Sequence, residues 1–309
     1  MADLVELRPN GLYCAPGDFY IDPWEPVERA VITHAHPDRA HPGSRAYLTA
    51  RAGESLLRAV VGPEALVEAA EYGHSLKLGG AAVSLHPAGH IPGSAQVRVE
   101  YDGEVWVVSG DYKLEPDPTC APFEPVRCHT FLTEATYGLP IFRWPPPAET
   151  MASTHAWWRA NQEAGKNSLL YANPVGKMQR IVAMLDRSIG PVEQVTGLPA
   201  PERQAGDLPR LVLAPPSLHN TPWSRQFAPA STALAAGWMR IRGTRRRRAL
   251  DRGFVLSDHA DWPSLLRAID ATGAETVGVT HGFRGPLVRW LEEHGRRAVA
   301  VDARFESDL

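Results

Sequence analysis

Two histidines and an aspartate that could bind a metal ion stand two residues apart in the segment ERAVITHAHPDRAHPGS, residues 28–44. His34 and His36 point the same way in extended chain, and Asp38 can turn back toward them where the preceding apolar run ends. Imidazole and carboxylate groups suit zinc or manganese in a hydrolytic site. The segment therefore predicts part of a metal centre. Arg39, directly beside it, does not fit, because a guanidinium cannot ligate a metal.

Further candidate ligands recur where other apolar runs end. His90 lies in the loop of LHPAGHIPGS, Asp111 ends WVVSGD, and His281 lies in VTHG. A single loop histidine is more often a hydrogen-bonded bystander than a ligand. Together, however, these residues follow strands in the way that a site along one sheet edge requires. Asp22, which ends FYID, could orient a ligand histidine or could cap a turn.

The elements that must position these residues are mostly short strands over residues 1–135. Apolar runs predict strands at residues 19–22, 28–33, 81–86, 95–101 and 104–109. The pair Asp102-Gly103 predicts a hairpin between the last two. One helix is expected over residues 53–62.

A change of character follows residue 135 and is reversed near residue 252. Successive prolines in RWPPPAE interrupt any regular element, which places a boundary near residue 146. A small α/β insert then follows, with predicted helices at 152–165 and 176–186, strands at 168–172 and 210–214, and a loop-rich run at 190–209. Afterwards the first pattern resumes, with strands at 253–257, 276–280 and 298–301 and helices at 261–273 and 285–295. We expect domains at 1–145, 146–251 and 252–309, with the first and third forming one fold.

Length and composition describe an ordinary globular protein. A chain of 309 residues with 44% hydrophobic content can bury a core. The first residues lack the pattern of a secretory signal, and no run approaches the roughly 20 apolar residues that span a bilayer. We expect a cytoplasmic protein without membrane association. Cys14, Cys120 and Cys128 lack C-x-x-C spacing, which argues against a disulfide framework and a thiolate zinc site.

The charge distribution bears on nucleic-acid binding more than the formal net charge of -3 does. Six arginines fall within the segment IRGTRRRRALDR: Arg242, Arg245, Arg246, Arg247, Arg248 and Arg252. Such a run is either a solvated face that pairs with carboxylates or a phosphate-binding patch.

The order THAHPD, AGH, SGD, TEATYG, SDH, THG resembles the metallo-β-lactamase fold, and specifically its nucleic-acid-processing branch with a β-CASP insert. The segments GLYCAPGDFYIDPW, TCAPFEPVRCHTF and GWMRIRGTRRRRALDRGFVLSDHADWP resemble a narrower group, the bacterial ligase-associated DNA exonucleases. The resemblance implies an αββα sandwich built from both ends of the chain, with the small α/β insert as a cap.

The resemblance also implies the roles of the site residues. One metal would take His34, His36 and His90, and Asp111 would bridge to a second metal held by Asp38 and His281. Arg39 stands where a further histidine ligand of that second metal is expected. Zinc is the expected ion, with manganese as the alternative. Asp38, Glu134 and His259 are the implied catalytic residues, with His259 as the proton donor and Glu134 as its orienting partner.

Arg39 leaves three outcomes open. The second metal could bind weakly with water in the gap, Arg39 could replace its charge and hold the phosphate, or the protein could bind nucleic acid without turnover. His41 is a less favoured substitute ligand.

The leading functional hypothesis is a metal-dependent exonuclease that hydrolyses phosphodiester bonds at DNA ends in DNA repair. An ATP-dependent DNA ligase is the partner that the narrower group implies. RNA processing is the main alternative, because a histidine in the third motif, as at His281, is more typical of RNA-processing members. Small-molecule hydrolases of the wider fold would lack Glu134, His259 and the cap. The expected nucleic-acid-binding residues are Arg39, Lys177, Arg180, Arg245, Arg246, Arg247 and Arg248.

Overall fold

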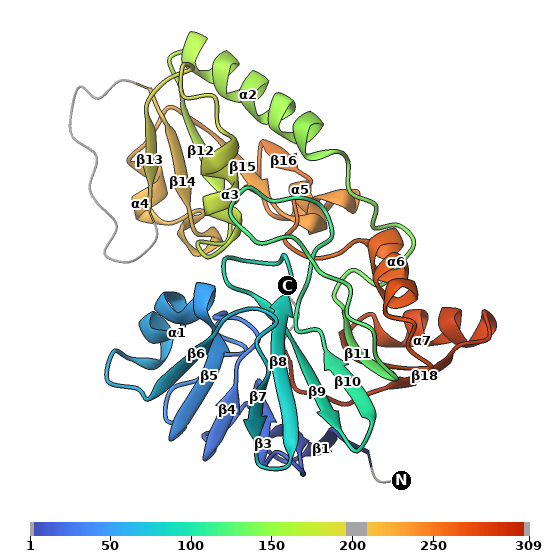
Figure 1. Cartoon of the computed structure of the whole chain (residues 1–309). Helices are drawn as coiled ribbons and strands as arrows, with labels where there is room; N and C mark the ends of the chain where they lie inside the picture. The colour runs from blue at the N-terminus through green and yellow to red at the C-terminus, as the bar shows by residue number, and fades with distance from the viewer. Residues whose placement is uncertain (1–2, 196–208, 306–309) are drawn as a thin grey trace. The chain divides into compact units, whose positions relative to one another are not determined.

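The computed structural model, which is mixed α/β, describes residues 3–195 and 209–305 (Figure 1). The chain divides into two compact units. The first unit comprises residues 1–141 and 258–309, and the second unit comprises residues 142–257.

Two sheets form the first unit. The six-stranded sheet has the order β1-β2-β3-β4-β5-β6, with β1 (Glu6–Arg8), β2 (Gly11–Cys14), β3 (Phe19–Ile21), β4 (Arg29–Val31), β5 (Ala46–Ala50) and β6 (Val67–Ala70). The seven-stranded sheet has the order β18-β17-β11-β10-β9-β8-β7, with β18 (Arg297–Ala300), β17 (Thr276–Gly282), β11 (Thr130–Ala135), β10 (Glu104–Val108), β9 (Ala95–Tyr101), β8 (Ala81–Pro87) and β7 (Leu76–Leu78). Side chains of both sheets share one core cluster, including Phe19 and Val31 from one and Leu85 and Val97 from the other. The two sheets therefore pack face to face.

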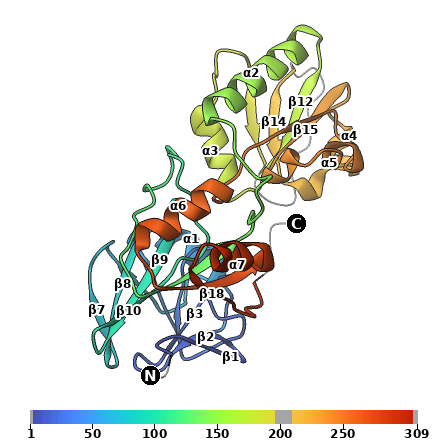
Figure 2. The same cartoon turned by 90° about the vertical axis from the view of Figure 1, so that its right-hand side faces the viewer.

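Helices cover the outer faces of these sheets. The helices α6 (Trp262–Thr272) and α7 (Arg284–Glu293) cover the seven-stranded sheet (Figure 2). On β10, Trp106 and Val108 join the core between the sheets, whereas Val107 joins a second cluster with residues of these two helices. Successive side chains of a strand alternate between its two faces in this way. The helix α1 (Glu54–Val61), which follows the 3₁₀ turn η1 (Arg51–Gly53), packs through Leu57 on the six-stranded sheet. The layers are helix, sheet, sheet and helix.

The second unit has one parallel sheet with the order β13-β14-β12-β15-β16. Its strands are β13 (Val192–Gln194), β14 (Leu211–Ala214), β12 (Asn167–Tyr171), β15 (Ala230–Ala235) and β16 (Arg252–Phe254). Its helices are α2 (Pro147–Glu163), α3 (Lys177–Met184), α4 (Pro222–Arg225) and α5 (Thr244–Arg247), with 3₁₀ turns η2 (Pro216–Leu218) and η3 (Gly237–Arg240). Trp158 is fully buried in the core of this unit.

Most elements predicted from the sequence are confirmed. The Asp102-Gly103 hairpin joins β9 to β10, with Tyr101 paired to Glu104 and a left-handed φ at both turn residues. The strands β1, β2, β5, β6, β7, β11, β13 and β15 were not among the predicted elements. The predicted loop at 190–209 was wrong at β13, and its residues 196–208 lie outside the described part of the chain.

The domain bounds differ from the expected ones at both ends. The prolines interrupt regular structure as far as Pro146, and Pro147 is the first residue of α2, where its missing N–H is tolerated. The strand expected at 253–257 does not return to the first fold, since β16 pairs with β15 of the second unit. The second unit therefore runs from 142 to 257 rather than from 146 to 251. No helix among the described residues is long and apolar enough to span a membrane.

Candidate metal centre

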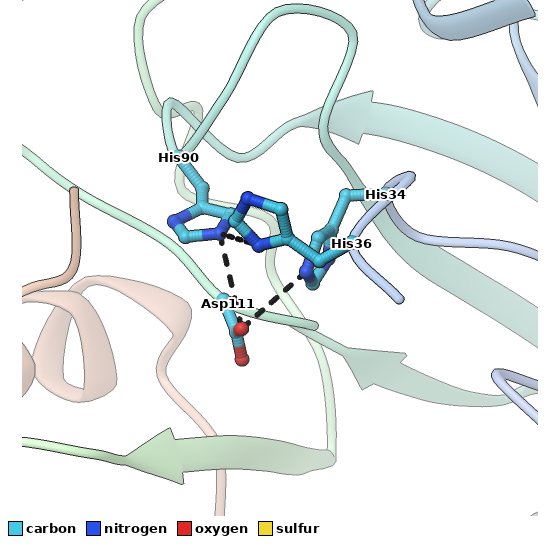
Figure 3. Close-up of side chains that lie close together, drawn as sticks. All are labelled: His34, His36, His90 and Asp111. Carbon is cyan, nitrogen blue, oxygen red and sulfur yellow. Dashed lines mark hydrogen bonds and ion pairs between the residues drawn. The ribbon is translucent and has the colours of Figure 1, made fainter. Parts of the chain in front are cut away.

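Four predicted ligands converge in the first unit, each from a loop that follows a strand. His34 and His36 come after β4, His90 comes after β8, and Asp111 comes after β10. One ligand atom from each lies within 4.8 Å of the others, and all four side chains are buried (Figure 3). The structure thus brings together residues up to 77 positions apart, from 34 to 111, in the way that the strand-end pattern predicted.

Hydrogen bonds fix the tautomers of two of these histidines. The Thr33 hydroxyl donates to Asp22 Oδ2 at 2.6 Å, so it accepts from His34 Nδ1 at 3.0 Å. The buried Nε2 of His34 then carries a lone pair, has no hydrogen-bond partner among the described residues and lies 3.4 Å from Asp111 Oδ2. His90 Nδ1 donates to the Asp258 carbonyl at 2.8 Å, which directs its Nε2 toward His36 Nδ1 at 3.1 Å.

Charge states complete a donor set for one divalent ion. Burial lowers the pKa of His34 well below its ordinary value, and burial with the nearby His259 and His36 lowers the pKa of His90 to about 4. Both rings are therefore neutral near pH 7, which is the form that ligates. Burial acts to raise the pKa of Asp111, but Arg39 and neighbouring histidines outweigh it and hold that pKa well below the usual range. Neutral imidazoles with one carboxylate fit zinc or manganese.

Asp22 supports this set from behind. It accepts from the Thr33 backbone N–H at 2.8 Å as well as from the Thr33 hydroxyl. Burial raises its pKa to about 7. Asp22 therefore acts on His34 through Thr33, which matches the predicted role of orienting a ligand histidine rather than that of capping a turn.

Asp38, Asp111 and His281, the residues expected around a second metal, surround the Arg39 guanidinium instead. Nη2 of Arg39 donates to Asp111 Oδ1 at 2.6 Å and lies 2.9 Å from His281 Nε2, and its Nε is 3.1 Å from Asp38 Oδ2. The guanidinium also stacks on Phe305, 3.8 Å from the ring centroid. Arg39 was predicted to contact nucleic acid, but its side chain is only 1% exposed.

A second pair lies beside the candidate ligands. Glu134, at the buried strand β11, accepts from His259 Nδ1 at 3.0 Å and from the Tyr112 backbone N–H at 2.8 Å. The rings of His259 and His90 are 4.6 Å apart between centroids. One ligand atom from each of Asp111, Glu134 and His259 also lies within 4.8 Å of the others. The predicted pairing of Glu134 with His259 is therefore present in the geometry.

The expected nucleic-acid-binding residues of the second unit fall into two groups. Lys177 and Arg180, at the start of α3, are buried, and Arg180 Nη1 donates to the Ser257 carbonyl at 2.6 Å. Their predicted role as phosphate contacts stays a prediction. The exposed group is the arginine run of α5 and the residue after it: Arg245, Arg246, Arg247 and Arg248.

Two threonines that position ligands were not among the predicted site residues. Thr33 precedes His34 and Thr280 precedes His281, and each hydroxyl contacts the Nδ1 of the next residue, at 3.0 and 2.8 Å. The repeated dipeptide Thr-His at two strand ends was the signal that could have identified them.

Comparisons with known proteins agree with this picture at a coarse level. No family model matches the chain. The chain is 29% identical to a probable DNA ligase of Opitutus terrae over 97% of its own length, and 33% identical to ribonuclease TTHA0252 of Thermus thermophilus over 39% of it. It spans about a third of each of these relatives, 31% and 34%. A crystal structure of a protein of unknown function from Enterococcus faecalis shares the fold, with a TM-score of 0.52 and 12% identity over 90% of this chain and 80% of that one.

Proposed function

We propose that this chain is a metal-dependent nuclease of the metallo-β-lactamase fold that hydrolyses phosphodiester bonds at DNA ends. The observation that carries the proposal is the buried convergence of His34, His36, His90 and Asp111 beside the Glu134–His259 pair. Similarity to a protein named as a ligase and to one named as a ribonuclease supports a nucleic-acid substrate.

The donor set would hold one zinc or manganese ion. When bound, such an ion would activate water near neutral pH and stabilise negative charge on a phosphodiester. The protein's own contribution is to keep the imidazoles neutral and oriented, through Thr33 for His34 and the Asp258 carbonyl for His90. Arg39 adds a fixed positive charge beside Asp111.

His259 is suited to protonate the leaving oxygen. Glu134 accepts a hydrogen bond from its Nδ1–H and so favours the imidazolium, which can donate from the opposite nitrogen. Two backbone N–H groups, those of Tyr112 and Thr136, also donate to Glu134 at 2.8 and 3.4 Å and fix the carboxylate. Removing His259 should therefore affect turnover more than metal binding.

We further propose that the second unit is the β-CASP cap and that the protein acts in cytoplasmic DNA repair with an ATP-dependent ligase. We also propose that the arginine run of the second unit neutralises backbone phosphates. The exposed positions of Arg245, Arg246, Arg247 and Arg248 support this role in phosphate binding.

The test uses end-labelled single- and double-stranded DNA with Zn²⁺ or Mn²⁺. We expect cleavage by the wild type, none by Asp111→Ala, and unchanged cleavage by His74→Ala, which alters an exposed histidine outside the site. Labelled RNA of the same sequence competes in the same assay. Preferential cleavage of RNA would replace the DNA assignment, and tight binding without cleavage by any metal would rule out the nuclease.

A further inference from the structure

We propose that Arg39 occupies the place of a second metal ion, so that the chain binds one divalent ion beside a built-in guanidinium. This inference rests on the proposed metal centre for the first ion. Its starting point is that Asp38, Asp111 and His281 could together hold an ion but converge on Arg39.

The two oxygens of Asp111 face different partners. Oδ2 lies 3.4 Å from His34 Nε2 and 3.8 Å from His90 Nε2, on the side of the candidate ion. Oδ1 lies 2.6 Å from Arg39 Nη2 and 3.0 Å from His281 Nε2. A carboxylate placed to bridge two metal ions therefore bridges one ion site and a guanidinium.

His281 directs its lone pair at the arginine. The Thr280 hydroxyl donates to the Thr133 carbonyl at 3.1 Å, so it accepts from His281 Nδ1 at 2.8 Å. Arg39 Nη2, which can only donate, lies 2.9 Å from Nε2, so Nε2 accepts from it. The electron pair that would bind a metal ion is used by an arginine N–H.

Charge and packing favour this arrangement over a second ion. The guanidinium stays protonated and is matched by the carboxylates of Asp38 and Asp111, while Phe305 covers its face. A dication placed among the same groups would meet the fixed positive charge at hydrogen-bond distance, without solvent to screen it. It would also lack the further histidine ligand expected at position 39, which Arg39 cannot replace as a ligand.

The decisive measurement is the number of divalent ions bound per chain, determined by elemental analysis after equilibrium dialysis against Zn²⁺ or Mn²⁺. We expect one ion in the wild type and two in Arg39→His, which offers an imidazole in place of the guanidinium. Adding Asp38→Asn to Arg39→His should return the ratio to one, since Asp38 would be a ligand only of the second ion. His41→Ala is the matched control and should remain at one, because His41 lies outside both groups of candidate ligands.

The outcomes separate this proposal from the proposed function. A ratio of two in the wild type overturns the role of Arg39, even if Arg39→His fails to fold. A ratio of one in both the wild type and a folded Arg39→His also overturns it. One ion in the wild type and two in Arg39→His, without nuclease activity, supports the role of Arg39 and rejects the nuclease. A wild type that binds no ion rejects both.

Discussion

A threonine hydroxyl sets the tautomer of a site histidine twice in this protein. Thr33 and Thr280 each donate to an acceptor elsewhere and are left to accept from the Nδ1 of His34 and His281, respectively. The opposite nitrogen of each ring is thereby prepared to receive a metal ion or a donor before either arrives. The two sites differ in their occupant rather than in the preparation of their ligands.

Replacement of Thr33 with valine tests this preparation. Thr33→Val removes the acceptor for His34 Nδ1 and a donor to Asp22, so the ring loses its fixed tautomer. We expect metal affinity to fall about 10- to 100-fold, as for other groups that orient metal ligands. Competition with a chromogenic chelator measures it. Thr49→Val is the control, since Thr49 is buried but its hydroxyl donates to the Ile32 carbonyl rather than to a candidate ligand. Equal affinities in both variants would contradict the role of Thr33.

At the residue scale the sequence identified the ligand types but not their partners. His34, His36, His90 and Asp111 were predicted because imidazoles and carboxylates at strand ends are visible in one dimension. The hydrogen bonds of Arg39 were not predicted, because they join it to Asp111 and His281, which lie 72 and 242 residues away along the chain. Burial of Lys177 and Arg180 was also invisible, because a charged side chain in a sequence gives no sign of its packing.

At the scale of elements, the end of β10 needs a residue without a side chain. Gly110 adopts φ 57°, and a Cβ there would lie 2.6 Å from Thr33 Oγ1. Glycine thus allows the chain to turn Asp111 into the site while passing directly against the threonine that holds His34.

Alanine at position 110 should therefore damage both stability and metal binding. The matched control is Gly103→Ala, because Gly103 also has a positive φ but a Cβ added there would have no atom within 4 Å. We expect Gly103→Ala to cost about 1–2 kcal/mol from backbone strain alone, and Gly110→Ala to cost about 1–3 kcal/mol more from overpacking. Urea unfolding measures the stability of both variants, and competition with a chromogenic chelator measures their metal affinity. Similar losses would show that Thr33 moves aside freely.

The loop after β10 is held by a buried ion pair. Lys113 Nζ lies 2.6 Å from Asp117 Oδ2, and the two side chains are 1% and 3% exposed. Burial acts to raise the pKa of Asp117, but the charge and hydrogen bond of Lys113 and bonds from Thr119 outweigh it and lower that pKa. The pair therefore stabilises the fold fully above the ordinary aspartate pKa of about 4 and loses this effect as pH falls through the lower folded value.

We expect Asp117→Asn to cost about 3–5 kcal/mol at pH 7, because it removes the carboxylate that pairs with the buried Lys113 ammonium. The difference from wild type should shrink below about pH 4, as Asp117 becomes protonated in the wild type. Denaturant midpoints at several pH values measure this. The exposed pair Arg289–Glu293 serves for comparison, and Glu293→Gln should cost less than about 1 kcal/mol. A pH-independent difference for Asp117→Asn would contradict the ionic origin.

Elements with clear local signals were predictable, whereas several strands without such signals were not. The helix α6 has an Asp261 cap and Pro263 near its start, and both signals are local. Strands of three residues, such as β1, β7 and β13, carry too few positions for a period and exist because a neighbour supplies the pairing.

For the molecule as a whole, a formal net charge of -3 means that nucleic-acid affinity has to come from local charge. The exposed Arg245, Arg246, Arg247 and Arg248 form the densest such group in the sequence. If they bind phosphates, replacing all four with glutamine should reduce the slope of log affinity against log salt by about 0.9 for each duplex-DNA phosphate that is no longer neutralised. Fluorescence anisotropy at several salt concentrations measures the slope. Arg289 is an exposed arginine on α7, and Arg289→Gln should leave the slope unchanged. An unchanged slope in the quadruple variant would exclude the arginine run as a binding surface.

The sequence predicted that the chain has an inserted unit more accurately than it predicted the residues where that unit begins and ends. The return point was expected at residue 252 because 253–257 has the pattern of a buried strand, which the strands of either sheet share. Only the pairing of β16 with β15 assigns it to the second unit, and pairing partners are not encoded locally.

The parallel pairing of β11 with β17 has a consequence for how such a chain can change. These neighbours in one ladder are separated along the chain by the entire second unit and α6. Since α6 alone could connect two adjacent parallel strands, as in an ordinary βαβ crossover, the ladder's hydrogen bonds do not depend on anything between residues 142 and 257. Exchange, lengthening or loss of that stretch during evolution would leave every candidate ligand on its own strand end, free to be combined with a different inserted unit.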